Sequence, residues 1–179
     1  MIVIGIDPGS VNTGYGVLEK NGSKLRLIEY GVIKAKKKNE NFPLRLKEIF
    51  ERLNSVIERT LPDEAAIESM FYHKNAQTLM KLSHARGVAM LSATLKEIPV
   101  MEYAPMEIKK SVTGRGAASK EQVQFMVKRI LNIDETPEFF DVTDALAVAI
   151  CHSTRRTIGV NKTSNWNDFI KNNPSRVKY

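Results

Sequence analysis

The first seven residues place a carboxylate at the end of a strand that must be buried. Residues 1–6 read MIVIGI and are followed at once by Asp7-Pro8-Gly9. A short apolar run bounded by turn residues is typical of a strand covered on both faces of a sheet. Removing an ionised carboxylate from water costs several kcal/mol unless a cation or hydrogen bonds compensate. Asp7 is therefore either an ordinary solvated turn residue or an acid that needs a positive partner.

The bulk composition fits one folded domain with a polyanionic partner. The chain has 179 residues, a hydrophobic fraction of 42% and a charged fraction of 26%, which are ordinary values for a folded protein. A net charge of +7 favours nucleic acid or an anionic surface as a partner. The single cysteine, Cys151, excludes an internal disulfide and a thiolate metal cluster. Without a signal-peptide pattern or a run of about 20 apolar residues, we expect a cytoplasmic protein with no membrane partner.

The order of predicted elements indicates an α/β fold. Three strands come first, and Asn21-Gly22 predicts a hairpin between the second and third. Helices and short strands then alternate, which predicts a mixed five-stranded sheet, three antiparallel strands and then parallel ones, with helices on both faces. We expect one domain over 1–155 and a basic, flexible tail over 156–179. The predicted strands are 2–7, 14–19, 25–34, 65–68 and 99–103, and the predicted helices are 43–61, 75–95, 119–131 and 141–155.

Three further acids, like Asp7, lie where an acid would need a positive partner or an ordinary structural role. Glu68 also closes a short apolar strand, and parallel pairing of that strand with the first would bring Glu68 beside Asp7. Asp141 and Asp144 are three residues apart, so they share one face of the last helix. Each has an ordinary alternative, a solvated strand end for Glu68 and a helix cap or dipole partner for the aspartates. Together, four clustered carboxylates would repel unless Mg²⁺ or Mn²⁺ ions separated them. Two such ions promote phosphodiester hydrolysis.

At these residues the chain resembles the RuvC-type Holliday junction resolvases, a ribonuclease-H-like family. The resemblance implies that Asp7, Glu68, Asp141 and Asp144 are catalytic ligands of two Mg²⁺ ions, with Mn²⁺ as a substitute, although relatives vary at the position of Asp141. It implies a homodimeric endodeoxyribonuclease that nicks two opposed strands of a four-way junction, leaving 5′-phosphate and 3′-hydroxyl ends. It also implies the RuvA/RuvB branch-migration complex as a partner. The matching segments are 5–10, 13–16, 67–71, 74–76, 81–82, 85–89 and 144–150.

Two segments near these acids are candidates for DNA contact. Phe71, Tyr72 and Lys74 follow Glu68, where aromatic side chains can stack on unpaired bases or simply anchor a loop. The second group surrounds a Gly-rich connection and either meets phosphates or is merely solvated. The resemblance favours Phe71 as a residue that inserts into the junction. It also favours Lys109 and Lys120 as basic residues that flank the active site. That second group consists of Lys109, Lys110, Arg115 and Lys120.

Three other functions compete with this hypothesis. The segment from Gly5 to Thr13 also resembles the first phosphate loop of actin-like ATPases, but a chain of 179 residues is too short for their two lobes. A ribonuclease-H-like nuclease acting on RNA, of the YqgF type, is a closer alternative. A junction-binding module without catalysis is the third, although such a module would be expected to have lost one or more of the four carboxylates.

Overall fold

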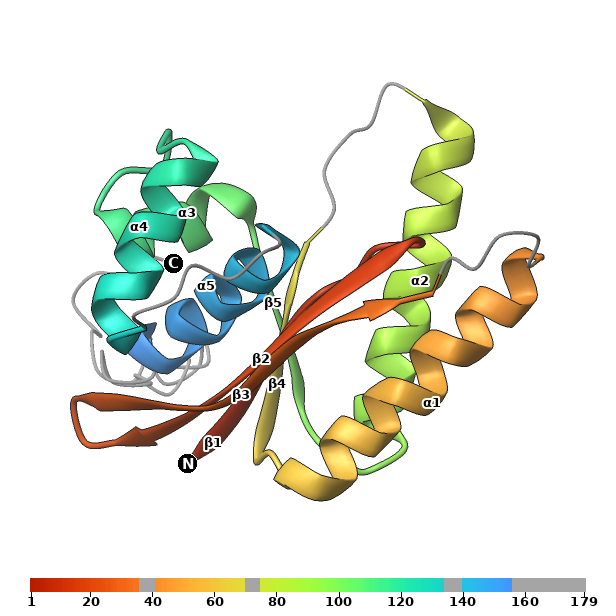
Figure 1. Cartoon of the computed structure of the whole chain (residues 1–179), viewed down its shortest axis with the longest axis horizontal. Coiled ribbons are helices and arrows are strands. Elements are labelled where there is room, and N and C mark those ends of the chain that lie inside the picture. The colour runs from red at the N-terminus through yellow and green to blue at the C-terminus, as the bar shows by residue number, and fades with distance from the viewer. Residues whose placement is uncertain (36–40, 70–74, 134–139, 156–179) are drawn as a thin grey trace, which may run out of the picture.

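The computed structural model describes residues 1–35, 41–69, 75–133 and 140–155. Within them lies one five-stranded sheet in the order β3-β2-β1-β4-β5. The first three strands pair antiparallel, and β4 and β5 continue the sheet parallel to β1, as predicted (Figure 1). The strands are β1 (Ile2–Asp7), β2 (Asn12–Asn21), β3 (Lys24–Lys34), β4 (Glu64–Glu68) and β5 (Val100–Tyr103).

Helices cover both faces of this sheet, which confirms the predicted α/β class. Figure 1 shows α1 and α2 on one side of the strands and α3, α4 and α5 on the other. A separate hydrophobic core fills the space on each side. The helices are α1 (Phe42–Thr60), α2 (Ala76–Thr94), α3 (Pro105–Thr113), α4 (Lys120–Leu131) and α5 (Phe140–Arg155).

Alternation along the central strands decides which side chains face α5. In β1, Ile4 and Ile6 pack into the core under α1 and α2, whereas Val3 packs into the core under α5. Because successive side chains of a strand point to opposite faces, Asp7 follows Val3 toward the α5 side. In β4, Ala66 belongs to the α5-side core, so Glu68 points the same way. The pleat therefore places both strand-end acids on one face.

Two local predictions are confirmed with small changes. The hairpin between β2 and β3 exists, but its turn lies one residue later than predicted, at residues 22–23, with Gly22 at φ +60°. The predicted capping box opens α4: the Ser119 hydroxyl accepts from the Gln122 amide at 3.3 Å, and the Gln122 side chain accepts from the Ser119 amide at 3.0 Å. Helix α4 ends at Leu131, as expected.

Helix α3 is a feature that the sequence prediction missed. The sequence prediction assigns no element to residues 105–113, whereas the structure makes them a helix that carries Lys109 and Lys110. Two signals for it are present in the sequence. Pro105 occupies the first turn, and the Glu107 carboxylate accepts a hydrogen bond from the Ala104 amide at 3.0 Å.

The far end of α5 is anchored to the sheet by a buried polar network. His152 is 2% exposed, and its Nδ1 lies 2.9 Å from Tyr103 Oη while its Nε2 lies 2.6 Å from Glu64 Oε2. These contacts make His152 a structural residue, and Cys151 beside it is a buried free thiol. No helix in the described ranges is long and apolar enough to span a membrane. The predicted tail, 156–179, lies outside the described residues.

Candidate active site

Two strand ends bring the first pair of acids together. The parallel register aligns Ile6 of β1 with Ile67 of β4, so the next residues, Asp7 and Glu68, end adjacent strands at the same edge. Adjacent strands are about 4.8 Å apart. The predicted side-by-side placement of these two carboxylates is therefore confirmed.

The turn that follows Asp7 is closed by a buried threonine. The Thr13 hydroxyl donates to the Gly9 carbonyl at 2.9 Å and accepts from the Gly9 amide at 3.4 Å. Thr13 itself is fully buried. Asp7-Pro8-Gly9 is therefore a turn, as one of the two interpretations expected, and this turn is compatible with a functional role for Asp7. The chain bends away after Asp7 and leaves its carboxylate at the sheet edge.

The first turns of α5 supply the second pair of acids. Asp141 and Asp144 are partly buried, and both act electrostatically on Asp7. Burial, and after it the carboxylates of Asp144, Glu68 and Asp141 in that order, together raise the pKa of Asp7 to about 8. The pKa of Glu68 is also raised, first by burial and then by Asp144. The structure therefore brings the other three predicted acids within electrostatic reach of Asp7.

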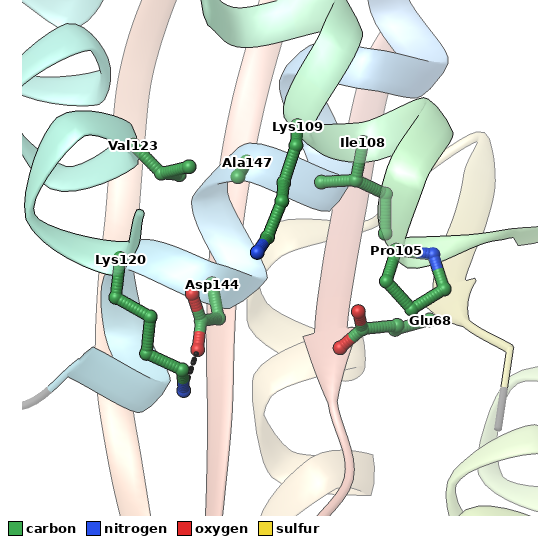
Figure 2. Close-up of a pocket in the computed structure, with 8 residues that line it drawn as sticks. All are labelled: Glu68, Pro105, Ile108, Lys109, Lys120, Val123, Asp144 and Ala147. Carbon is green, nitrogen blue, oxygen red and sulfur yellow. Dashed lines mark hydrogen bonds and ion pairs between the residues drawn. The ribbon is translucent and has the colours of Figure 1, made fainter. Parts of the chain in front are cut away.

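Two lysines enter the same region from separate helices. Figure 2 shows Lys109 extending from α3 and Lys120 from α4 toward Asp144. The Lys120 ammonium lies 2.9 Å from Asp144 Oδ2, and this hydrogen bond raises the pKa of Lys120. Both ammonium groups lower the pKa of Glu68, against the effect of its burial. Lys120 also lowers the pKa of Asp7.

A cleft of about 220 Å³ opens beside this cluster (Figure 2). Its polar lining is Glu68, Lys109, Lys120 and Asp144. Its remaining walls are apolar and were not predicted, because they come from three helices whose packing the sequence does not reveal. These apolar residues are Pro105, Ile108, Val123 and Ala147.

The donor set at this edge fits a hard divalent cation. Four carboxylates and no nitrogen or sulfur ligand match the preference of Mg²⁺ and Mn²⁺ for oxygen. In the described ranges, however, no three acidic, histidine or cysteine side chains are arranged to hold one ion. The backbones of the acids are set by the sheet and by α5, so ion binding requires a rearrangement of side chains.

The described structure places no other predicted contact residue in this cleft. Lys110 is exposed on α3 and does not line the cleft, and Arg115 lines a different hollow together with Phe125. Phe71, Tyr72 and Lys74 lie outside the described residues. Roles in DNA contact for all five residues stay predictions.

Comparisons with known proteins agree with this geometry. The family model described as "Crossover junction endodeoxyribonuclease RuvC" matches residues 3–152. The protein of that name from Cytophaga hutchinsonii is 46% identical over 177 residues, covering 99% of this chain and 88% of its own length. The structure of Thermus thermophilus RuvC in complex with Holliday junction substrate superposes with a TM-score of 0.83 at 34% identity, covering 89% of this chain and 96% of that one. A yeast mitochondrial Holliday junction resolvase, at 16% identity over 87% of this chain and 80% of its own, shares the fold with a TM-score of 0.63.

The raised pKa of Asp7 predicts how stability depends on pH. Its carboxyl keeps a proton up to pH about 8 in the folded protein but loses it near pH 3.8, its ordinary value, when unfolded. This contribution to stability is therefore complete below pH 3.8 and is lost as the pH rises to about 8. With EDTA present, Asp7→Asn should melt above wild type at pH 8.5, and the difference should shrink toward pH 4.5. Each kcal/mol corresponds to about 2–4 °C at this chain length, measurable by calorimetry. A difference that does not change with pH would contradict the assignment.

Proposed function

Because the chain belongs to the RuvC family of crossover junction endodeoxyribonucleases, we propose that it resolves four-way DNA junctions by metal-dependent hydrolysis of phosphodiester bonds. The observation that carries this proposal is the edge where β1 and β4 end. Four carboxylates and two lysines from three helices and two strands meet there. Such a site suits a negatively charged backbone that must be held and cut.

Asp7, Glu68, Asp141 and Asp144 would hold two Mg²⁺ ions, for which Mn²⁺ would substitute. Two such ions, when bound, stabilise the attacking and leaving oxygens of an in-line displacement. The carboxylates determine where the cations would bind, because the ends of two strands position two of them and one helix positions the other two. A non-catalytic binding module would have no need of four acids placed where burial and mutual repulsion raise the pKa of Asp7 to about 8.

Lys109 and Lys120 would orient the DNA strand. Each ammonium group carries a compact charge on a flexible stem, which suits contact with a phosphate oxygen. Cleavage with departure of the 3′-oxygen would leave 5′-phosphate and 3′-hydroxyl ends.

A substrate panel combined with Asp7→Asn tests the activity. With Mg²⁺, wild type should nick a synthetic four-way junction symmetrically and leave a linear duplex and an RNA–DNA hybrid intact. Asp7→Asn should lower nicking by about 10²–10⁴-fold, since a metal contributes several kcal/mol to catalysis. It should still bind the junction in a gel-shift assay, because Asp7 holds no phosphate. Glu58→Gln makes the same chemical change at an exposed surface acid on α1 and should cut like wild type.

Three results would contradict parts of this proposal. Cleavage of the hybrid in preference to the junction would favour the RNA-acting alternative. Junction binding without cleavage by wild type, with Mg²⁺ or Mn²⁺, would favour the non-catalytic module. Full activity of Asp7→Asn at saturating Mg²⁺ would remove Asp7 from the metal ligands.

The two cleft lysines should contribute to the salt dependence of binding. Each phosphate contact adds about 0.9 to the slope of log affinity against log salt concentration. Lys109→Ala and Lys120→Ala should therefore each reduce the slope by about 1 and lower the nicking rate. Lys47→Ala, at an exposed lysine on α1, should leave both unchanged. A slope equal to that of wild type would exclude the altered lysine from the phosphate contacts.

A face of α2 supports assembly as a homodimer. Apolar side chains that are 61%, 49% and 59% exposed, those of Met80, Leu91 and Leu95, recur there at helical spacing. Gly87 lies on the same face, and a Cβ added to it would meet nothing within 4 Å. Neither the glycine nor the stripe has an explanation within the described part of the subunit. Residues seven and four apart along a helix, with a glycine among them, suit close packing against the same helix of a second copy.

Leu91→Glu tests this interface. The charge would be buried between two copies of α2, so sedimentation velocity should show a monomer where wild type is a dimer. Junction nicks on opposed strands should then lose their coupling. Leu61→Glu is the matched control, because Leu61 is 73% exposed at the end of α1 and away from the stripe. A dimeric Leu91→Glu would place the interface elsewhere, and a monomeric wild type would overturn the dimer.

Two further expectations come from the sequence and from the family resemblance. We propose that the enzyme acts with the RuvA/RuvB branch-migration complex and in the cytoplasm, where its DNA substrate lies. We also propose that residues 1–155 form the nuclease domain and that the basic residues 156–179 form an appendage to it.

A further inference from the structure

Gly14 of β2 lies where β2 meets β1 and the first turn of α5. It is the register partner of Asp7 in the antiparallel pairing of β1 and β2. A Cβ built on Gly14 would overlap the Asp141 carbonyl oxygen and would lie 2.5 Å from the Asp141 carbonyl carbon and 3.2 Å from Asp141 Cβ. Only a hydrogen fits between β2 and the first turn of α5. The backbone of Asp141 therefore rests directly on the residue paired with Asp7.

Two other glycines support the rest of α5 but touch no acid. A Cβ on Gly5 would lie 2.7 Å from the Ala149 amide, and one on Gly16 would lie 2.8 Å from Leu146 Cγ. These contacts lie in the part of α5 that is more than one helical turn C-terminal to Asp141. Asp144 has its own restraint in the hydrogen bond from Lys120. Crowding at Gly14 would thus move Asp141 while the other three acids keep their places.

We propose that Gly14 is a positioning residue that sets the distance between Asp141 and Asp7, and so the site of one of the two cations. This inference rests on the proposed function. An ordinary contact begins near 3.4 Å, so a methyl group at Gly14 would push the start of α5 outward by at least about 1 Å. A misplacement of that size in a catalytic group costs about 10²-fold in rate. Gly14 carries no functional group, and its contribution is the absence of a side chain.

Binding of MnCl₂ followed by isothermal titration calorimetry tests the proposal without relying on turnover. Wild type should bind two Mn²⁺ ions, and Gly14→Ala should bind the second about 10-fold more weakly and nick the junction about 10²-fold more slowly. Gly16→Ala is the matched control. It adds the same methyl group to the same strand under the same helix, but against Leu146 and not against the backbone of an acid, so it should weaken binding of the second Mn²⁺ ion less than Gly14→Ala does.

A double-variant cycle separates positioning from a general loss of structure. If Gly14 acts through Asp141, then adding Gly14→Ala to Asp141→Asn should weaken Mn²⁺ binding no further. Asp141→Glu, whose side chain is one methylene longer, should partly restore Mn²⁺ binding to Gly14→Ala. A residue that merely stabilises the fold would show neither result.

Each contrary outcome is decisive. Mn²⁺ binding by Gly14→Ala equal to that of wild type would overturn the proposal, as would a full additional loss in the Asp141→Asn background. A Gly14→Ala protein that fails to fold, while Gly16→Ala folds, would also overturn it, because the displacement would not be confined to the first turn. If wild type itself bound no Mn²⁺ or cut no junction, the proposed function would fail instead.

Discussion

The close seating of α5 on the central strands is the constraint on which the rest of the structure depends. Glycines at positions 5, 14 and 16 remove the side chains that would otherwise hold the helix away from β1 and β2. Because the helix rests against the backbone, its acids reach the level of the carboxylates that end β1 and β4. The same seating buries the apolar side of α5 in one of the two cores. The contact between α5 and the sheet therefore both forms a hydrophobic core and positions the four acids.

That arrangement concentrates like charges, which ordinary folding would avoid. Burial and three neighbouring carboxylates raise the pKa of Asp7 to about 8. Helices α3 and α4 partly offset this cost by directing Lys109 and Lys120 into the same cleft. The position of α3 is itself secured by Glu107, which caps its first turn and accepts from Arg155 of α5 at 2.7 Å. Clustered charges with strongly shifted pKa values are expected where a protein performs chemistry.

Local patterns in the sequence were enough to predict most elements and the four acids. The apolar run before Asp7, the hairpin turn and the Ser119 capping box each have a local physical cause, and each is present in the structure. Helix α3 was missed because it is only 9 residues long and its burial depends on two residues, Ile108 and Val112. So short a helix has little stability of its own and forms because α5 and α4 provide a surface for it.

The sequence by itself determined which residues carry charge, where strands end and which helix bears Asp141 and Asp144, because these follow from residue type and spacing along the chain. Only the tertiary structure decided that β4 pairs with β1 in a register that aligns Asp7 with Glu68, that Lys120 reaches Asp144, and that Gly14 rather than Gly16 touches Asp141. Those facts join residues far apart in the chain. They depend on strand register, on the pleat and on how closely a helix can approach a sheet, and no local pattern encodes them.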